Sequence, residues 1–119
     1  MKPKGRLSKV SLLELTNKVE EDWKSLRVAT INDQDIRVSI LQREFHWHTH
    51  NDSDEAFYVI QGCLEVDFED RTETLGPGDL LVVPCGTLHR TRSNLRTVSI
   101  CFTASGTEPT GDLASAKPQ

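Results

Sequence analysis

Hydrophobic and polar residues repeat with two different periods along the chain. From Leu12 onward, apolar side chains recur at helical spacing through Leu15, Val19 and Trp23. Ser11, which stands three residues before Glu14, supplies a capping pattern for the start of that segment. The spacing therefore predicts a short helix over residues 12–23. Beyond it, residues 36–40 alternate between apolar and polar, and this period of two is typical of a strand.

Short strand-like runs then continue almost to the end of the chain, with turn-forming residues such as Asn32, Gly62 and Gly78 between them. The predicted strands span residues 28–31, 36–40, 43–50, 55–61, 63–68, 72–75, 79–83, 88–93 and 96–103. Many short strands at such regular spacing predict an all-β fold, a sandwich or jelly-roll barrel, over about residues 27–103. We expect residues 104–119, which are rich in Ser, Thr, Gly and Pro, to form a strap or a frayed end.

Length and composition narrow the setting of this fold. A chain of 119 residues has room for one domain with one core, so we expect a single domain over residues 1–119. Its net charge of −4 disfavours binding to nucleic acid or to an acidic membrane surface. No apolar stretch is long enough for a membrane span, and no secretion signal is visible. The three cysteines form no CxxC pair and cannot all be disulfide-bonded within one chain. We therefore expect a reducing environment and a cytoplasmic protein.

The four histidines lie in only two short segments, and this clustering is the main chemical signal. His46, His48 and His50 would share one face of a strand, because side chains alternate along it. Glu55 opens the next predicted strand, and His89 follows a turn that would redirect the chain. We therefore expect His48, His50, Glu55 and His89 to converge on one metal ion. The alternative is a group of ordinary core or surface histidines.

Three imidazoles and one carboxylate suit one divalent transition metal ion, whether Fe, Mn, Ni, Co, Cu or Zn, and the ligand set does not choose among them. Calcium prefers a cage of oxygen atoms. A six-coordinate ion held by four side chains would keep two open positions, which is the mark of a catalytic site. Glu55 is then the candidate catalytic residue, because a carboxylate that leaves the metal can act as a base.

Neighbouring residues define the expected pocket. His46 lies on the ligand face, but the spacing to Glu55 fits the pair His48 and His50, so we interpret His46 as a pocket residue and not a fifth ligand. Phe57 and Val59 follow Glu55 on its own face and either line the pocket or belong to the core. Cys85, beside the turn before His89, is interpreted as a small buried cysteine and not as a redox-sensitive thiol.

The same residues resemble a known family. The segment from His48 through Glu55 to Gly62 resembles the first motif of the cupins, and the segment from Gly78 to His89 resembles their second motif. Features across about residues 8–112 further resemble the small single-domain cupins called mannose-6-phosphate isomerase-like. Two positions depart from the motifs: Gln42 replaces a usual glycine, and Ser93 stands where an asparagine is usual. The resemblance implies a cupin double-stranded β-helix, the RmlC-like jelly roll.

The resemblance leaves the function open, because cupins host many chemistries on one barrel. One hypothesis is a metal-dependent enzyme acting on a small metabolite, dioxygenase-like or isomerase/lyase-like. The alternative is a non-catalytic module that binds a small molecule or senses a metal. Phosphosugar isomerisation is disfavoured because Arg90 and Arg92 would point away from the ligand face, leaving no basic residue facing inward. Trp47 and Tyr58, also opposite the ligands, favour burial against the helix or a second subunit, hence a homodimer.

Overall fold

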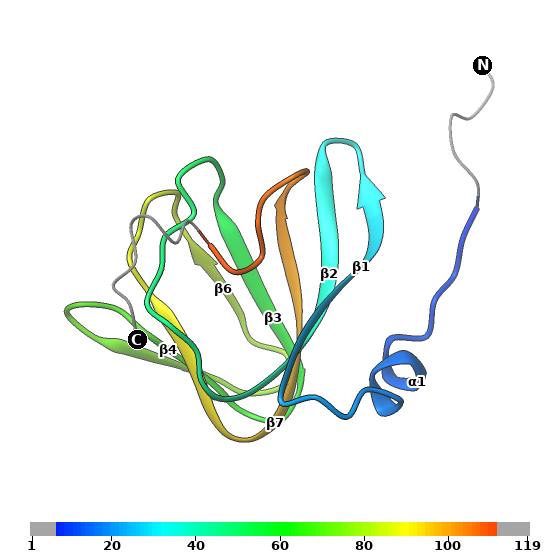
Figure 1. The fold of residues 1–119 in the computed structure, drawn as a ribbon, viewed down its shortest axis with the longest axis horizontal. Coiled ribbons are helices and arrows are strands. Elements are labelled where there is room, and N and C mark those ends of the chain that lie inside the picture. Colours follow the sequence, from blue (N-terminus) through cyan, green and yellow to red (C-terminus); the bar gives the residue numbers. More distant parts are fainter. Residues whose placement is uncertain (1–6, 112–119) are drawn as a thin grey trace.

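The computed structural model describes residues 7–111, and it shows a roll of strands with one short helix outside it (Figure 1). In chain order the elements are α1 Leu12–Asn17, β1 Trp23–Ile31, β2 Gln34–Glu44, β3 Glu55–Gln61, β4 Leu64–Asp67, β5 Thr72–Leu75, β6 Leu80–Val83 and β7 Arg90–Ala104. Within this part of the chain no helix is long and apolar enough to cross a membrane. The all-β jelly roll with one short N-terminal helix is confirmed.

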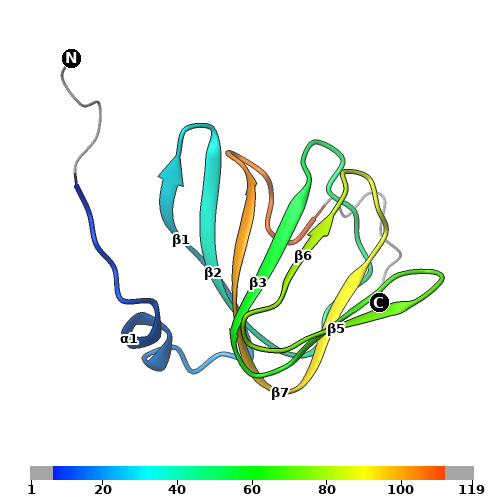
Figure 2. The same cartoon turned by 180° about the vertical axis from the view of Figure 1, so that it is seen from behind.

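The long strand β7 ties the roll together. The strand order is β1-β2-β7-β3-β6, and β4 pairs with both β5 and β7. All these pairs are antiparallel. The second half of β7 lies between β2 and β3, whereas residues Arg90 to Arg92 at its start pair with β4. One strand thus belongs to both sides of the roll, and Figure 2 shows it curving from one side to the other.

The interior has an apolar part and a polar part. Apolar side chains from five strands and from β7 form the buried cluster: Leu41, Phe57, Val59, Leu64, Val66, Leu75, Val83 and Cys101. β2 and β7 bury Val38, Ile40 and Val98, and alternating with these they bury small polar residues, among them Ser39, Ser99 and Thr97. Ser39 and Ser25 are within hydrogen-bond distance, with their Oγ atoms 3.3 Å apart. Small polar side chains leave room inside the roll, and that room is where the site lies.

The predicted helix over residues 12–23 is wrong in its second half. The helix starts as expected, because Ser11 Oγ accepts a bond from the Glu14 backbone N–H, but it ends at Asn17. Trp23 instead begins β1, and its ring stacks on Phe45 with the centroids 4.9 Å apart. Residues 20–22 are all acidic, and negative charge at a helix C-terminus opposes the helix dipole, so the sequence held a signal against the longer helix.

Two predicted strand boundaries also need correction. The predicted strand 43–50 does not form, because β2 ends at Glu44 and the following residues keep only an isolated bridge between His48 and His89. The predicted strands 88–93 and 96–103 are one continuous strand, β7. Its middle is irregular: Ser93 Oγ contacts the backbone oxygens of Cys63 and Leu95 there, so the polar residues bend the strand without ending it.

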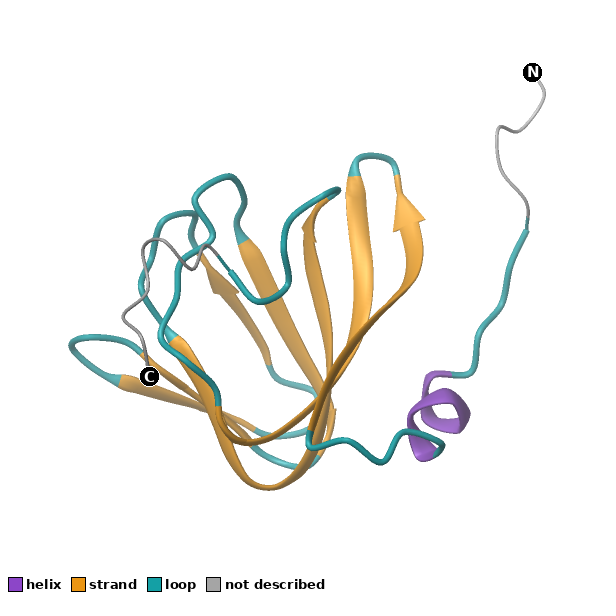
Figure 3. Cartoon of the chain, in the orientation of Figure 1, coloured by secondary structure: helices purple, strands orange, loops and turns teal. Residues whose placement is uncertain are grey.

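The predicted tail over 104–119 is described as far as residue 111, and there it is an ordered strap; the rest lies outside the described residues. Ser105 begins the strap with a backbone bond to the Asp33 carbonyl. Thr107 is buried, and its hydroxyl donates to the Ala104 carbonyl. In Figure 3 the strap is the loop that leaves the end of β7 and turns back, in contrast to the helix outside the roll. Of the two expectations, a strap or a frayed end, the described part is a strap, and it contacts His46 and His48.

Candidate metal centre

A short two-stranded bridge brings the two histidine segments together. The backbone N–H of His48 donates to the His89 carbonyl at 2.9 Å, and the N–H of His89 donates back to the His48 carbonyl at 3.0 Å. Two residues further, the Gly86 N–H donates to the His50 carbonyl at 2.8 Å. Gly86 has a φ of +80°, which favours glycine at this turn. The bridge and the turn hold together two segments that are about forty residues apart in the sequence.

Glu55 enters the same site as the first residue of β3. The loop before it is anchored on both sides, because Asp54 Oδ1 accepts the Cys85 N–H at 2.8 Å and Ser53 Oγ accepts the Ala104 N–H at 2.8 Å. β3 pairs with β6 and β7, so its first residue has a fixed register. The carboxylate is therefore presented by a rigid element, as a ligand or catalytic group requires.

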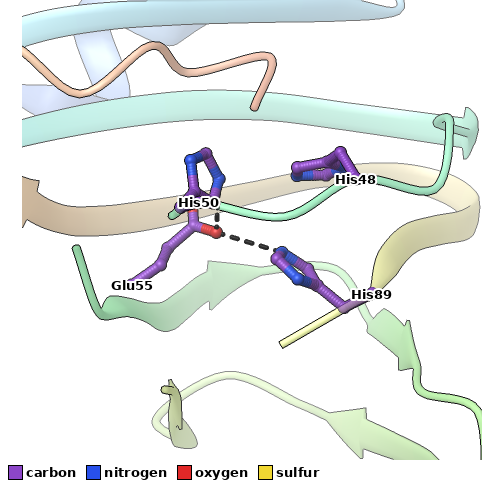
Figure 4. Close-up of side chains that lie close together, drawn as sticks. All are labelled: His48, His50, Glu55 and His89. Carbon is purple, nitrogen blue, oxygen red and sulfur yellow. Dashed lines mark hydrogen bonds and ion pairs between the residues drawn. The ribbon is translucent and has the colours of Figure 1, made fainter. Parts of the chain in front are cut away.

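The four residues expected to bind metal do meet. One ligand atom from each of His48, His50, Glu55 and His89 lies within 4.8 Å of the others. Figure 4 shows the three rings and the carboxylate pointing toward one another, with Glu55 Oε1 3.1 Å from His50 Nε2 and 3.2 Å from His89 Nε2. All four are buried, and His89 is fully so. The spacing of the residues in the sequence thus corresponds to one compact cluster.

Hydrogen bonds behind two of the rings decide which nitrogen carries the proton. His48 Nδ1 lies 2.8 Å from the His46 carbonyl oxygen, and His89 Nδ1 lies 2.8 Å from that of Thr87. A carbonyl oxygen only accepts, so Nδ1 must be the donor in both rings. Their Nε2 atoms then direct lone pairs toward the centre of the cluster when the rings are neutral. This is how metal-binding histidines are usually oriented.

The charge states also suit metal binding. Burial, together with the charge of His89, lowers the pKa of His48 to about 4, so its ring is neutral near pH 7. Burial alone would raise the pKa of Glu55, but hydrogen bonds from His50 and His89 outweigh it and lower that pKa to about 2. The cluster therefore combines an ionised carboxylate with a neutral imidazole. Both are the forms that coordinate a divalent ion.

The donor set fits a transition metal. Three nitrogen donors and one oxygen donor, buried and directed at one point, match the preferences of Fe, Mn, Co, Ni, Cu and Zn ions. Without an ion, the buried Glu55 carboxylate contacts His50 and His89. A cation at the centre of the cluster would bind the carboxylate oxygen and the ring nitrogens at the same time. The cluster can therefore hold a metal ion, and its identity is not determined by these ligands.

A cavity reaches the cluster from inside the roll. The cavity has a volume of about 30 Å³, opens to solvent, and has His48 and Glu55 in its walls. Its lining also includes the apolar residues Trp23, Leu41, Phe45, Phe57 and Pro109, the polar residues Ser25, Arg37, Ser39, Thr91 and Thr103, and Cys101. A metal ion held by the cluster would therefore be accessible to a small molecule, as a catalytic centre requires.

The three predicted pocket residues occupy different places. Phe57 lines the cavity, 3% exposed. Val59 is fully buried in the apolar cluster, away from the cavity wall. The His46 ring donates from Nε2 to the Thr110 carbonyl at 2.7 Å, so it fastens the strap, while its own backbone carbonyl orients His48. His46 thus lies behind the cluster and supports it from outside.

Sequence reasoning missed Arg37, and the statement that no basic residue faces inward is wrong. Arg37 lines the cavity, two residues before Ser39 on the same face of β2. The alternation over residues 36–40 contained this signal, but it was used only to place the apolar residues. Trp23 and Phe45 were also missed, Trp23 because it had been assigned to a helix. Phe45 stacks on Trp23 at the cavity wall, and its ring is 5.5 Å from that of His48.

The outward residues follow the expected alternation. Arg90 and Arg92 both bond Asp67 on the outer side, with Nε to Oδ2 distances of 2.9 and 2.7 Å, while Thr91 between them lines the cavity. Trp47 is half-buried under the Arg90 guanidinium, which lies 5.1 Å from its ring centroid. Tyr58 is exposed, so α1 does not cover it.

The cysteines differ from each other in exposure. The interpretation of Cys85 as a buried cysteine is wrong: it is exposed, and its thiol donates to the Asn51 carbonyl at 3.1 Å. Cys101 is the buried one, and burial, together with the charge of Glu55, raises the pKa of its thiol to about 12. The Cys101 thiol beside the cavity is therefore protonated and a poor nucleophile near neutral pH.

A jelly roll with a buried three-histidine, one-carboxylate cluster beside an internal cavity defines a class of small barrel proteins with a candidate metal centre. The family model described as Cupin domain matches residues 36–101, which is more than half of the chain. The chain belongs to this cupin family. Its fold is accordingly the cupin double-stranded β-helix.

Individual relatives agree with this assignment. The chain is 42% identical over 92 residues to the uncharacterized protein YdbB of Bacillus subtilis (strain 168), covering 76% of this chain and 81% of YdbB. A cupin-2 domain containing protein from Shewanella frigidimarina is similar in structure, with a TM-score of 0.76 and 26% identity over 80% of this chain and 93% of that one. KdgF from Halomonas sp. has a TM-score of 0.64 and 28% identity, over 73% and 83% of the two chains.

Proposed function

We propose that this cupin is a metal-dependent enzyme that acts on a small metabolite. The observation that supports it is the position of His48 and Glu55: both belong to the four-residue cluster and both line the cavity. A structural metal site is closed by its protein ligands, whereas a catalytic one faces a space that substrate can enter. The cluster here faces such a space.

The residues divide the work in a simple way. His48, His50, Glu55 and His89 would hold one divalent ion, which when bound would supply Lewis-acid polarisation of a substrate oxygen or, for iron, redox chemistry. The carbonyls of His46 and Thr87 keep two rings in the tautomer that binds metal. Glu55, at the cavity wall, is the group placed to exchange a proton with a bound substrate. Trp23, Phe45 and Phe57 exclude water from one side of the cavity.

The reaction is proposed to be either isomerase/lyase-like or dioxygenase-like, and the metal decides between them. Zinc, nickel or manganese in the purified protein would direct the search to isomerisation and lyase assays, which need no oxidant. Iron would direct it to oxygen-uptake assays. Metal binding without turnover of any substrate class in either assay would instead favour a non-catalytic module that binds or senses a small molecule.

The first experiment is elemental analysis of protein purified without chelator, beside two variants. His48→Ala removes one ligand of the cluster and should lose the metal. His46→Gln is the matched control: it removes a histidine two residues away, and its amide can still donate to the Thr110 carbonyl. It should retain about one equivalent. Failure of the wild-type protein to bind any divalent transition metal would refute the proposal.

Other expectations from the sequence stay predictions at this point. A homodimer agrees with the exposed apolar side chains of Tyr58, Leu80 and Val82, which β3 and β6 carry in paired registers. A small-molecule ligand agrees with the cavity beside the cluster. Cytoplasmic location and membership of the mannose-6-phosphate isomerase-like group also stay predictions.

A further inference from the structure

The cavity is lined by a positively charged side chain, Arg37, whose presence the proposed metal centre does not explain. Arg37 lines the cavity wall, and its Nε atom is buried with no hydrogen-bond partner among the described residues. Within residues 7–111, no carboxylate oxygen lies close enough to the Arg37 guanidinium to form an ion pair. The side chain as a whole is half-buried, so the cost falls on the Nε donor, and a ligand that accepts from this atom would remove that cost.

The neighbours of Arg37 reinforce its positive charge. Arg27 stands directly opposite it in the β1–β2 ladder, and like charges in such a pair are unfavourable. Asp35, two residues before Arg37 on the same face, is already engaged: its carboxylate accepts bonds from Thr30, Ser105 and the Gly106 N–H. None of the described carboxylates therefore forms an ion pair with Arg37.

Sheet register places Arg37 at a useful distance from the metal cluster. Arg37 pairs with Cys101 on β7, and Cys101 pairs with Phe57 on β3, two residues after Glu55. Adjacent strands are about 5 Å apart, so the Arg37 and Phe57 backbones are separated by roughly 10 Å. The Arg37 and Glu55 side chains extend into the space between these strands, so the distance left between them suits a molecule with a few carbon atoms. Arg37, His48 and Glu55 line this one cavity.

Charge points to the chemistry of the ligand. A divalent ion with Glu55 and three neutral histidines would retain one net positive charge, and Arg37 adds a second. Guanidinium binds carboxylates with two parallel hydrogen bonds. We propose that Arg37 is the specificity-determining residue of the site, and that the substrates are small organic acids whose carboxylate binds Arg37 while a second oxygen faces the metal cluster. This inference rests on the proposed function and names its substrate class.

Pyruvate and its uncharged amide, pyruvamide, are the probes, because they share shape and differ in the carboxylate. Binding is measured by calorimetry and by the visible absorption of the Co(II)-loaded protein. Arg37→Gln should weaken pyruvate binding roughly 10- to 100-fold, the loss of a charged hydrogen-bond pair. Arg37→Lys should lie between, because a lysine keeps the charge without the planar pair of donors. Pyruvamide binding should be weak in all variants.

Arg43→Gln is the matched control, since Arg43 is on the same strand, exposed and paired with Asp22 at 2.7 Å. It should bind pyruvate like the wild type. A second measurement separates ligand recognition from a structural role: Arg37→Gln should leave Tm unchanged or raise it, because it removes a donor, Nε, that is buried without a partner. A lowered Tm together with unchanged pyruvate affinity would show that Arg37 supports the fold and would overturn the inference.

The failure of this inference and that of the proposed function give different results. If the wild type binds Co(II) but Arg37→Gln binds pyruvate as tightly, or the wild type binds no pyruvate, the inference is wrong and the metal centre stands. If the wild type binds no metal but metal-free protein binds pyruvate in an Arg37-dependent manner, the proposed function is wrong and carboxylate recognition stands.

Discussion

Gly111, the last described residue of the strap, packs directly against the ring of His48. A Cβ atom added at Gly111 would lie 2.7 Å from His48 Cγ and 2.8 Å from His48 Cβ, and would overlap Cδ2. Gly111 also has a φ of +82°, where side chains are strained. Gly111→Ala should therefore disturb the metal centre from a position that contributes no ligand.

The geometry sets the size of the effect. Ordinary contact begins at 3.4 Å, so the strap and the His48 ring must separate by at least about 0.7 Å, the amount needed at Cγ, and by more at the closer Cδ2. The strap is held by the bond from His46 to the Thr110 carbonyl, so part of that movement should fall on His48. Metal–ligand distances tolerate only about 0.2 Å. We expect metal affinity to fall 10- to 100-fold, about 1.4 to 2.8 kcal/mol.

Gly106→Ala supplies the control, because Gly106 has a φ of +87° and open space around an added Cβ. Both variants should lose about 1–2 kcal/mol of stability from backbone strain, measured by urea unfolding of the metal-free protein. Only Gly111→Ala should also lose metal affinity, measured by competition with a coloured chelator. Equal metal affinity in the two variants would refute the reasoning, since it would mean that the strap moves and His48 does not.

Two further predictions concern the rest of the molecule. Asp67 is nearly buried and accepts bonds from two arginines and Thr72, and the arginine bonds hold its pKa well below the ordinary 3.8, although burial opposes them. Asp67→Asn should therefore lower the free energy of unfolding by about 2 kcal/mol, measured with urea at pH 7. Because the pKa of Asp67 is lowered in the folded state, the difference between wild type and variant should shrink as the pH falls below 3.8. A difference that does not depend on pH would contradict the ion-pair explanation. If the protein is a homodimer through its exposed apolar sheet face, Leu80→Glu should give monomers in light scattering whereas Leu95→Glu, equally apolar and exposed elsewhere, should not; a monomeric wild type would disprove the dimer.

The parts of the fold that were predicted correctly depend on local pattern. Turn residues such as Asn32 and Gly78 separate strands in the structure as they do in the sequence, because their backbone conformations are set by near neighbours. The four clustered residues were identified because their sequence spacing is constrained: His48 and His50 must reach one point from one segment. Local constraints of this kind are written in the sequence and need no knowledge of distant contacts.

The parts that were missed depend on contacts between distant segments. Trp23 follows helical spacing, yet it joins β1 because Leu41 and Phe45 provide a ladder partner and a stacking partner. The sequence of the strap gives no periodic signal, although Gly111 and Thr110 contact two histidines more than sixty residues earlier. Tertiary partners decided both cases: the acidic residues 20–22 argued against the longer helix, but no window of the sequence could have shown which distant residues Trp23 and the strap contact.

Arg37 was missed for a different reason. The sequence alternation shows which face of the strand it occupies, but not that this face borders a cavity. An arginine at an alternating strand position is usually a solvated side chain, and only the sheet order shows that this face of β2 borders a cavity that Glu55 also lines. The buried Arg37 Nε atom without a partner then becomes informative, because none of the described carboxylates forms an ion pair with this arginine. Residues that the fold alone does not account for are where a ligand is best sought, and in this barrel Arg37 lines the same cavity as His48 and Glu55.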